Sequence, residues 1–278
     1  DAVIMDATYP INIDKLCASR PVAKRTAHCS GCTNKCALTI FLSQNGRKYF
    51  VGNNCERVFS NRDGERERGT NLFTLRNQIV FERSTAAKAP ALGVRIGIPR
   101  ILGMFETFPF WNALLTECGF EVVLSPPSDQ SQYEKGLGTV MSDNICFPAK
   151  LAHGHVADLI AAGVDRLFYP HVVYNAREDE TSANTYNCPI VSAYGEVLRG
   201  SMGLGEKGKP PLDAPAVSFR DEKLLKKACR GYLRPFGVSR RRFDGAFAAA
   251  LRAREECRKA LVRQGKALAS PDGRSEEH

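Results

Sequence analysis

Alternating apolar and polar positions predict a short β-hairpin near the start of the chain. Residues 37–43 (ALTIFLS) and 47–52 (RKYFVG) are rich in β-branched and aromatic side chains, as strands are. Between these runs, Asn45 and Gly46 occupy the two positions where a type I′ turn requires positive φ. The pattern therefore predicts two antiparallel strands joined by a tight two-residue turn.

A change to helical spacing follows the hairpin. Residues 71–84 (NLFTLRNQIVFERS) fit a short amphipathic helix. Its inward side is predicted to carry four apolar residues: Leu72, Leu75, Ile79 and Val80.

Strand-like and helix-like runs alternate from residue 93 onward. The expected strands are 94–99, 120–127, 165–170 and 188–194, and the expected helices are 101–120, 147–164 and 195–202. Pro148 suits the first turn of the second helix, where a missing N–H is tolerated, and Gly163 suits its end. This alternation predicts an α/β fold with a Rossmann-like, doubly wound parallel sheet. Such sheets bind ligands at the carboxyl ends of their strands.

The last part of the chain is predicted to be helical and basic. Residues 206–278 carry a net charge of +8, out of +9 for the whole chain. A solvated helical face accounts best for this charge, with phosphate groups or an acidic partner as the alternative. Nucleic acid is disfavoured because the aromatic residues fit an apolar helix face better than stacking platforms. The sequence thus divides into four parts: a linker (1–20), a Cys-rich module with its connecting helix (21–90), a Rossmann-like α/β domain (91–205) and a basic helical segment (206–278).

The cellular compartment is inferred from the N-terminal sequence and from the length of the apolar runs. No run approaches the roughly 18–20 apolar residues that a membrane span needs. The chain opens without an initiator Met and without a secretory signal, so we expect a cytoplasmic piece of a longer polypeptide. Thiols in such a chain are expected to be reduced.

Four of the ten cysteines surround the predicted hairpin. Cys29, Cys32 and Cys36 form a compact knuckle before it, and Cys55 follows it. Four thiolates suit tetrahedral Zn²⁺, and they equally suit a [4Fe–4S] cluster. The spacing favours a metal site of one of these kinds over buried, reduced thiols without metal.

A second group of residues lies near predicted strand ends. Cys146 and Lys150 stand at the start of the helix at 147–164, His171 follows the strand at 165–170, and Cys188 begins the strand at 188–194. The position of Cys188 weakens the case for a common site, because it enters its strand from the opposite end. Small buried cysteines and locally hydrogen-bonded histidines, such as His153 and His155, are the ordinary alternative.

These residues also carry a resemblance. The segments CFPAKLAHGHVADLIAAGVDRLFYP and NCPIVSAYGEVLR, at 146–170 and 187–199, resemble the uncharacterised CoA-enzyme-activase-associated domain. That domain is similar to the cluster-carrying subunits of 2-hydroxyacyl-CoA dehydratases and benzoyl-CoA reductases. The knuckle and the segment at 94–125 are similar to the family's cysteine module and first βαβ unit, so the resemblance covers about residues 25–270.

The resemblance implies anaerobic iron–sulfur chemistry. An activator hydrolyses ATP and passes a low-potential electron to a cluster in a dehydratase-like partner, which then reduces an acyl-CoA thioester. On this reading Cys146 and Cys188 are cluster ligands, whereas His171 replaces a position that is usually cysteine in the family. Members of the family continue into a second α/β domain, which this chain is expected to lack. No phosphate-binding loop of the G-x-x-x-x-G-K-[ST] type occurs, so any ATP is bound elsewhere.

Two functions therefore remain open from the sequence. One is an iron–sulfur electron-transfer or cluster-scaffold component of an ATP-dependent dehydratase/activase system, with acyl-CoA as a candidate ligand. The other is a non-catalytic interaction module with structural zinc that docks an activator ATPase. The sequence does not decide whether the chain is itself an enzyme.

Overall fold

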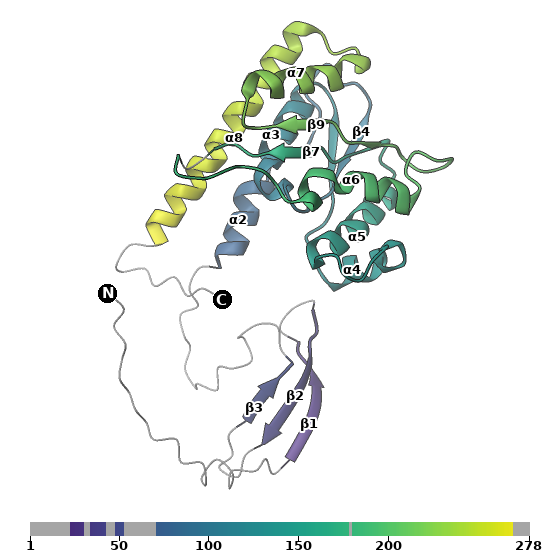
Figure 1. The fold of residues 1–278 in the computed structure, drawn as a ribbon, viewed down its shortest axis with the longest axis vertical. Coiled ribbons are helices and arrows are strands. Elements are labelled where there is room, and N and C mark those ends of the chain that lie inside the picture. Colours follow the sequence, from purple (N-terminus) through teal and green to yellow (C-terminus); the bar gives the residue numbers. More distant parts are fainter. Residues whose placement is uncertain (1–22, 31–33, 43–47, 53–70, 178–179, 269–278) are drawn as a thin grey trace. The chain divides into compact units, whose positions relative to one another are not determined.

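The computed structural model describes residues 23–30, 34–42, 48–52, 71–177 and 180–268. These residues belong to two compact units, one within residues 1–68 and one within residues 69–275 (Figure 1). Each unit is described by itself below.

The first unit contains a three-stranded antiparallel sheet in the order β1-β2-β3. Its strands are β1 (Ala23–His28), β2 (Ala37–Leu42) and β3 (Lys48–Val51). Both predicted strands are confirmed, whereas β1 was not predicted, because its sequence AKRTAH lacks apolar alternation and is mostly exposed.

The strands of the predicted hairpin pair in antiparallel register, from Thr39 opposite Val51 to Leu42 opposite Lys48. The predicted turn at Asn45-Gly46 lies outside the described residues and stays a prediction.

The second unit is built on a four-stranded parallel sheet in the order β5-β4-β6-β8. The strands are β4 (Arg95–Ile98), β5 (Glu121–Leu124), β6 (Arg166–Phe168) and β8 (Leu212–Asp213). The chain moves outward from β4 to β5 and then returns past β4 to β6. The strand order therefore reverses between β4 and β6, as in a Rossmann-like sheet.

Helices cover both faces of this sheet. Because such crossovers are right-handed, α3 (Met104–Glu117) lies on the face opposite to α5 (Phe147–Ala161). The helix α6 (Pro189–Met202) packs beside α5, and α8 (Arg240–Leu268) packs along α3 (Figure 1).

Two prolines interrupt neighbouring strands at the same level. After β6 and β8, the chain passes Pro170 and Pro215 and resumes as a two-stranded parallel sheet of β7 (His171–Tyr174) and β9 (Ala216–Ser218). The main-chain ladder is continued by Tyr169 N–H donating to Asp213 O at 3.0 Å and by His171 N–H donating to Pro215 O at 3.0 Å. Proline has no N–H to donate, so it breaks regular pairing at these points.

The aromatic core lies between α3 and the strands. Phe108, Phe110, Trp111 and Phe168 are at most 1% exposed. Trp111 packs edge-on against Phe110 and Phe168, with ring centroids 4.9 and 5.0 Å apart. This burial, rather than helix propensity, holds α3 in place, because the helix contains Pro109 in its interior.

A close glycine contact positions α5 against α4 (Gln130–Gly136). A Cβ atom at Gly154 would lie 1.6 Å from the carbonyl oxygen of Gln132, and one at Gly136 would lie 2.5 Å from the amide nitrogen of Gly154. The two helices can approach this closely only because both positions lack a side chain. The sequence pattern did not predict the helix α4.

The helix α2 (Leu72–Phe81) confirms the helix predicted at 71–84. Of its predicted inward residues, Val80 is buried and Ile79 packs against the core, but Leu72 is 41% exposed. Phe81 takes the buried position instead, because its ring packs against Phe105 and Phe108 of α3.

The clearest correction concerns residues 188–194, which were predicted to form a strand. Pro189 begins α6, and the helix runs without interruption into the segment predicted as the helix 195–202. The predicted C-terminal helices are confirmed as α7 (Glu222–Leu233) and α8. In the described part of the chain, no helix is long and apolar enough to cross a membrane.

Candidate functional site

Two of the four opening cysteines lie in the described residues. Cys29 and Cys36 directly follow β1 and precede β2, next to the last strand pair of His28 and Ala37. The Cys29 N–H donates to the Cys36 carbonyl oxygen at 2.9 Å. The sheet therefore brings these two residues together, while Cys32 and Cys55 lie outside the described residues. The four-cysteine metal site stays a prediction.

Cys146 and Cys188 occupy equivalent positions in two helices. Each is the N-cap residue of its helix, Cys146 of α5 and Cys188 of α6, and each has extended backbone, an exposed side chain and proline in the first helical turn. Neither N-cap side chain accepts a hydrogen bond from its own helix. Both thiols are therefore presented to solvent beside the positive end of a helix dipole, which favours negative charge.

The topology places both cysteines at the same edge of the sheet. A helix that connects two parallel strands starts at their carboxyl edge, and both α5 and α6 lead into strands of the sheet, β6 and β8. The predicted conflict for Cys188 disappears because it begins a helix rather than a strand. The main chain before it is also anchored, since Asn187 N–H donates to the Val173 carbonyl of β7 at 3.0 Å.

A buried hydrogen-bond network links α5 and α6, the two helices that begin at Cys146 and Cys188. On α5, His153 is fully buried, with Nδ1 2.9 Å from Thr139 Oγ1 and Nε2 2.9 Å from the hydroxyl of Tyr194 on α6. Thr139 donates its hydroxyl to the Gly136 carbonyl at 2.9 Å, so its oxygen accepts from His153 Nδ1–H. His153 Nε2 is then unprotonated and accepts the Tyr194 hydroxyl proton. Burial lowers the pKa of His153, which is consistent with this neutral form.

Tyr169 adds an unsatisfied hydroxyl at the same edge. It follows β6 directly, is 2% exposed, and has no hydrogen-bond partner for its hydroxyl among the described residues. Burial raises the pKa of Tyr169, and Cys188 and Tyr194 raise it further. Burial likewise raises the pKa of Tyr194, with Cys146 adding to the effect. Each cysteine is thus electrostatically coupled to one of two neutral, buried tyrosines.

These tyrosines were not identified from the sequence as site residues. Tyr169 was placed inside a predicted strand and Tyr194 inside another, and neither position carried a motif. The available signal was the parallel between Cys146-x-Pro148 and Cys188-Pro189, since proline close after an N-cap marks a helix start. With both helices recognised, Tyr194 would have been placed between two helices at the ligand edge.

His171 lies against α6. It is the first residue of β7 rather than a residue beyond a strand end, and its Nε2 atom is buried without a hydrogen-bond partner in the described residues. The ring fits because position 195 is glycine, where a Cβ atom would lie 2.7 Å from Nε2. Burial lowers the pKa of His171, partly opposed by Glu196, whose Oε1 is 3.9 Å from Nε2.

Lys150 is half-buried in the first turn of α5, where its N–H donates to the Cys146 carbonyl at 3.2 Å. Among the residues that the structure describes, no group of three or more His, Cys, Asp or Glu side chains is arranged to hold a metal ion. The ligand roles predicted for Cys146, Cys188, His171 and Lys150 therefore stay predictions.

The other histidine of α5 is structural. His155 is fully buried, and its Nδ1 and Nε2 atoms lie 2.8 and 2.9 Å from the hydroxyls of Ser125 and Ser128. Ser125 accepts the Arg100 N–H at 2.7 Å and is free to donate to His155 Nδ1. Both buried histidines thus have local hydrogen bonds, as expected for most histidines.

Comparison with known proteins gives one match. The family model described as CoA enzyme activase uncharacterised domain (DUF2229) matches residues 95–277, which include the whole four-stranded sheet and both cysteine-capped helices. No curated protein and no solved structure matches the chain.

Proposed function

Since the chain belongs to the CoA enzyme activase uncharacterised domain family, we propose that it serves as an iron–sulfur electron-transfer or cluster-scaffold component of an ATP-dependent 2-hydroxyacyl-CoA dehydratase/activase system. The observation that carries this proposal is the pair of N-cap cysteines, Cys146 and Cys188, presented at one edge of the sheet. The activator ATPase would be a separate domain or protein, because this chain contains no P-loop motif.

The described residues fit a cluster only in part. A [4Fe–4S] cluster is ordinarily held by four cysteine thiolates. The sheet edge offers two exposed thiols, and no group of three metal-ligating side chains forms in the described part of the chain. A cluster at this edge would need further ligands from outside these residues. When bound, such a cluster would store and pass on single electrons.

The chain's own residues have defined roles in this proposal. Cys146 and Cys188 would provide thiolates beside two helix N-termini, whose dipoles stabilise negative charge. Tyr194 is hydrogen-bonded to His153 and so links α6 to α5, the two helices that carry the thiols. Tyr169 would offer its free hydroxyl as a hydrogen-bond donor toward the same edge.

The second candidate is a non-catalytic module that docks an activator through the sheet domain, with zinc at the opening cysteines. The incomplete ligand set at the sheet edge favours this candidate. Cys29 and Cys36, which the strands bring together, would belong to its zinc site.

Metal analysis of protein purified without oxygen distinguishes the two. The cluster proposal predicts iron and acid-labile sulfide in the full chain, and loss of iron at the sheet edge in Cys146→Ala and Cys188→Ala. Cys257→Ala is the matched control, because Cys257 is buried in α8. Zinc without sulfide would support the docking module. Unaltered iron content in both variants would remove these cysteines from the ligand set.

A further inference from the structure

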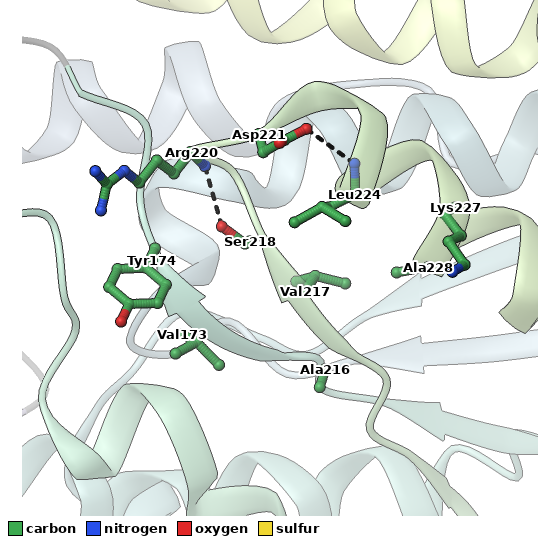
Figure 2. A pocket seen from close by; sticks show the side chains of 10 residues that line it. All are labelled: Val173, Tyr174, Ala216, Val217, Ser218, Arg220, Asp221, Leu224, Lys227 and Ala228. Carbon is green, nitrogen blue, oxygen red and sulfur yellow. Dashed lines mark hydrogen bonds between the residues drawn. The ribbon is translucent and has the colours of Figure 1, made fainter.

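A groove lies where the strands β7 and β9 meet α7 (Figure 2). Its volume of about 830 Å³ is in the range of small-molecule sites. Apolar side chains from the strands and the helix line its middle: Val173, Val217, Leu224 and Ala228. Leu224 is 57% exposed, so an apolar surface is open to solvent here.

Two basic side chains stand at opposite ends of this groove. Figure 2 shows Arg220 at one end and Lys227 at the other, with Val217 and Leu224 between them. No carboxylate of the described residues is within ion-pair distance of Arg220 or Lys227, whereas the neighbouring Lys226 is paired with Asp244 at 2.8 Å. The groove therefore combines an apolar middle with two positive charges that form no ion pair among the described residues.

The acidic residue of the groove is already engaged. Asp221 caps α7 by accepting the backbone N–H groups of Lys223 and Leu224 at 2.8 and 3.0 Å. Figure 2 shows its carboxylate turned toward the start of the helix. Its single charge leaves the groove net positive, and its hydrogen bonds leave it little capacity to hold a cation.

The location is one that parallel sheets use for ligands. Tyr174 and Ser218 end β7 and β9, and α7 begins four residues after Ser218. The groove thus runs along β9 and reaches the carboxyl ends of two parallel strands. The Arg220 guanidinium stands 5.9 Å from the Tyr174 ring, which limits where its charge can move.

We propose that this groove binds a small amphipathic anion, with its apolar chain along Val217 and Leu224 and its carboxylate or phosphate on Arg220 or Lys227. The groove is complementary to both parts of such a ligand, the apolar chain and the anionic group. An inorganic anion would leave the apolar middle exposed, and a neutral apolar molecule would leave both charges unpaired. The lining of the groove contains none of the residues predicted as cluster ligands, and the proposal does not rest on the function proposed above.

Titration calorimetry of the full chain tests the proposal with octanoate as the probe. Octanoate should bind, while 1-octanol, octylamine and inorganic phosphate should bind at least about tenfold more weakly, because each lacks one of the two complementary parts. Arg220→Gln or Lys227→Gln should weaken octanoate binding by a similar factor and so identify which end holds the anion. Ala216→Leu should also weaken it by filling the groove, since Ala216 lines it.

The matched control is Lys223→Gln, which removes one charge from the same helix outside the groove. Each variant is checked for an unchanged circular dichroism spectrum and melting temperature. The proposal is overturned if octanoate fails to bind at millimolar concentration, or if octanol binds equally well. It also fails if the Arg220 and Lys227 variants both bind like the control. Binding of an acidic, apolar peptide without binding of octanoate would assign the groove to a protein partner instead.

Discussion

Two pairs of cysteines in the same domain have opposite surroundings. Cys146 and Cys188 begin helices and are exposed. In contrast, Cys118 is buried at the C-terminal end of α3, and Cys229 is buried within α7. Burial raises the pKa of Cys118 to about 12, and it raises the pKa of Cys229 still further. The thiol chemistry of this protein is therefore set by position in the fold and not by the residue type. The buried pair behaves as small apolar residues, whereas the thiols of the exposed pair are accessible to reagents.

Alkylation rates should show the largest difference between the pairs. In the native chain, Cys146 and Cys188 should react with iodoacetamide roughly a thousandfold or more faster than Cys118 and Cys229, because a buried thiol reacts only after the structure opens. Peptide mass spectrometry after timed labelling measures the four rates separately. Equal rates in the native protein would contradict the comparison, and equal rates in urea are the control for intrinsic reactivity.

The pH dependence of the free energy of unfolding tests whether the neutral form of His155 stabilises α5, the helix that begins at Cys146. Burial lowers the pKa of His155 to about 4 from its usual 6.5, with Arg100 adding to this and Asp158 and Asp129 opposing it. The unfolded chain therefore binds the proton first as the pH falls. The contribution of neutral His155 to the free energy of unfolding is fully present above about pH 6.5. It decreases by about 3 kcal/mol in total as the pH falls toward about 4.

Urea unfolding at neutral and acidic pH measures this loss. His155→Gln keeps hydrogen-bonding capacity but cannot take up a proton, so it should flatten the slope between pH 6.5 and 4. An unchanged slope in this variant would assign the pH dependence to other groups.

Substitutions of the two tyrosines beside the exposed cysteines should have the smallest effects on the free energy of unfolding. Tyr194→Phe should destabilise the protein, whereas Tyr169→Phe should not. Tyr194→Phe leaves the buried His153 Nε2 without a donor and should lower the free energy of unfolding by about 1–3 kcal/mol. Tyr169→Phe removes a hydroxyl that has no partner in the described residues and should leave stability unchanged or raise it. Urea titration measures both.

Tyr186→Phe is the control for these variants, because Tyr186 is 56% exposed. It should change stability by less than about 0.5 kcal/mol. A large loss in Tyr169→Phe would mean that its hydroxyl is hydrogen-bonded after all, and no loss in Tyr194→Phe would contradict the His153–Tyr194 hydrogen bond.

Strong local patterns made much of the fold predictable. The alternation of residues 94–99, 120–127 and 165–170 with helical spacing predicted three of the parallel strands and the helices α3 and α5. The proline at position 148 and the glycine at 163 marked the limits of α5 to within two residues. These features depend on neighbours in the sequence, so the sequence alone carries them.

Other elements depended on partners far along the chain. The short run at 188–194 is apolar enough for either a buried strand or a helix, and its packing beside α5 decides for the helix. The strands β8 and β9 are only two and three residues long, and they exist because β6 and β7 provide the pairing groups.

The α/β class, the family and the candidate cysteines could all be read from the sequence. Only the folded structure shows that Cys146 and Cys188 start neighbouring helices at one sheet edge, that Tyr169 and Tyr194 lie beside them, and that Arg220 and Lys227 flank a groove. Local patterns fix backbone conformation through nearby residues. The meeting of side chains from distant segments is fixed only by how the helices and strands pack.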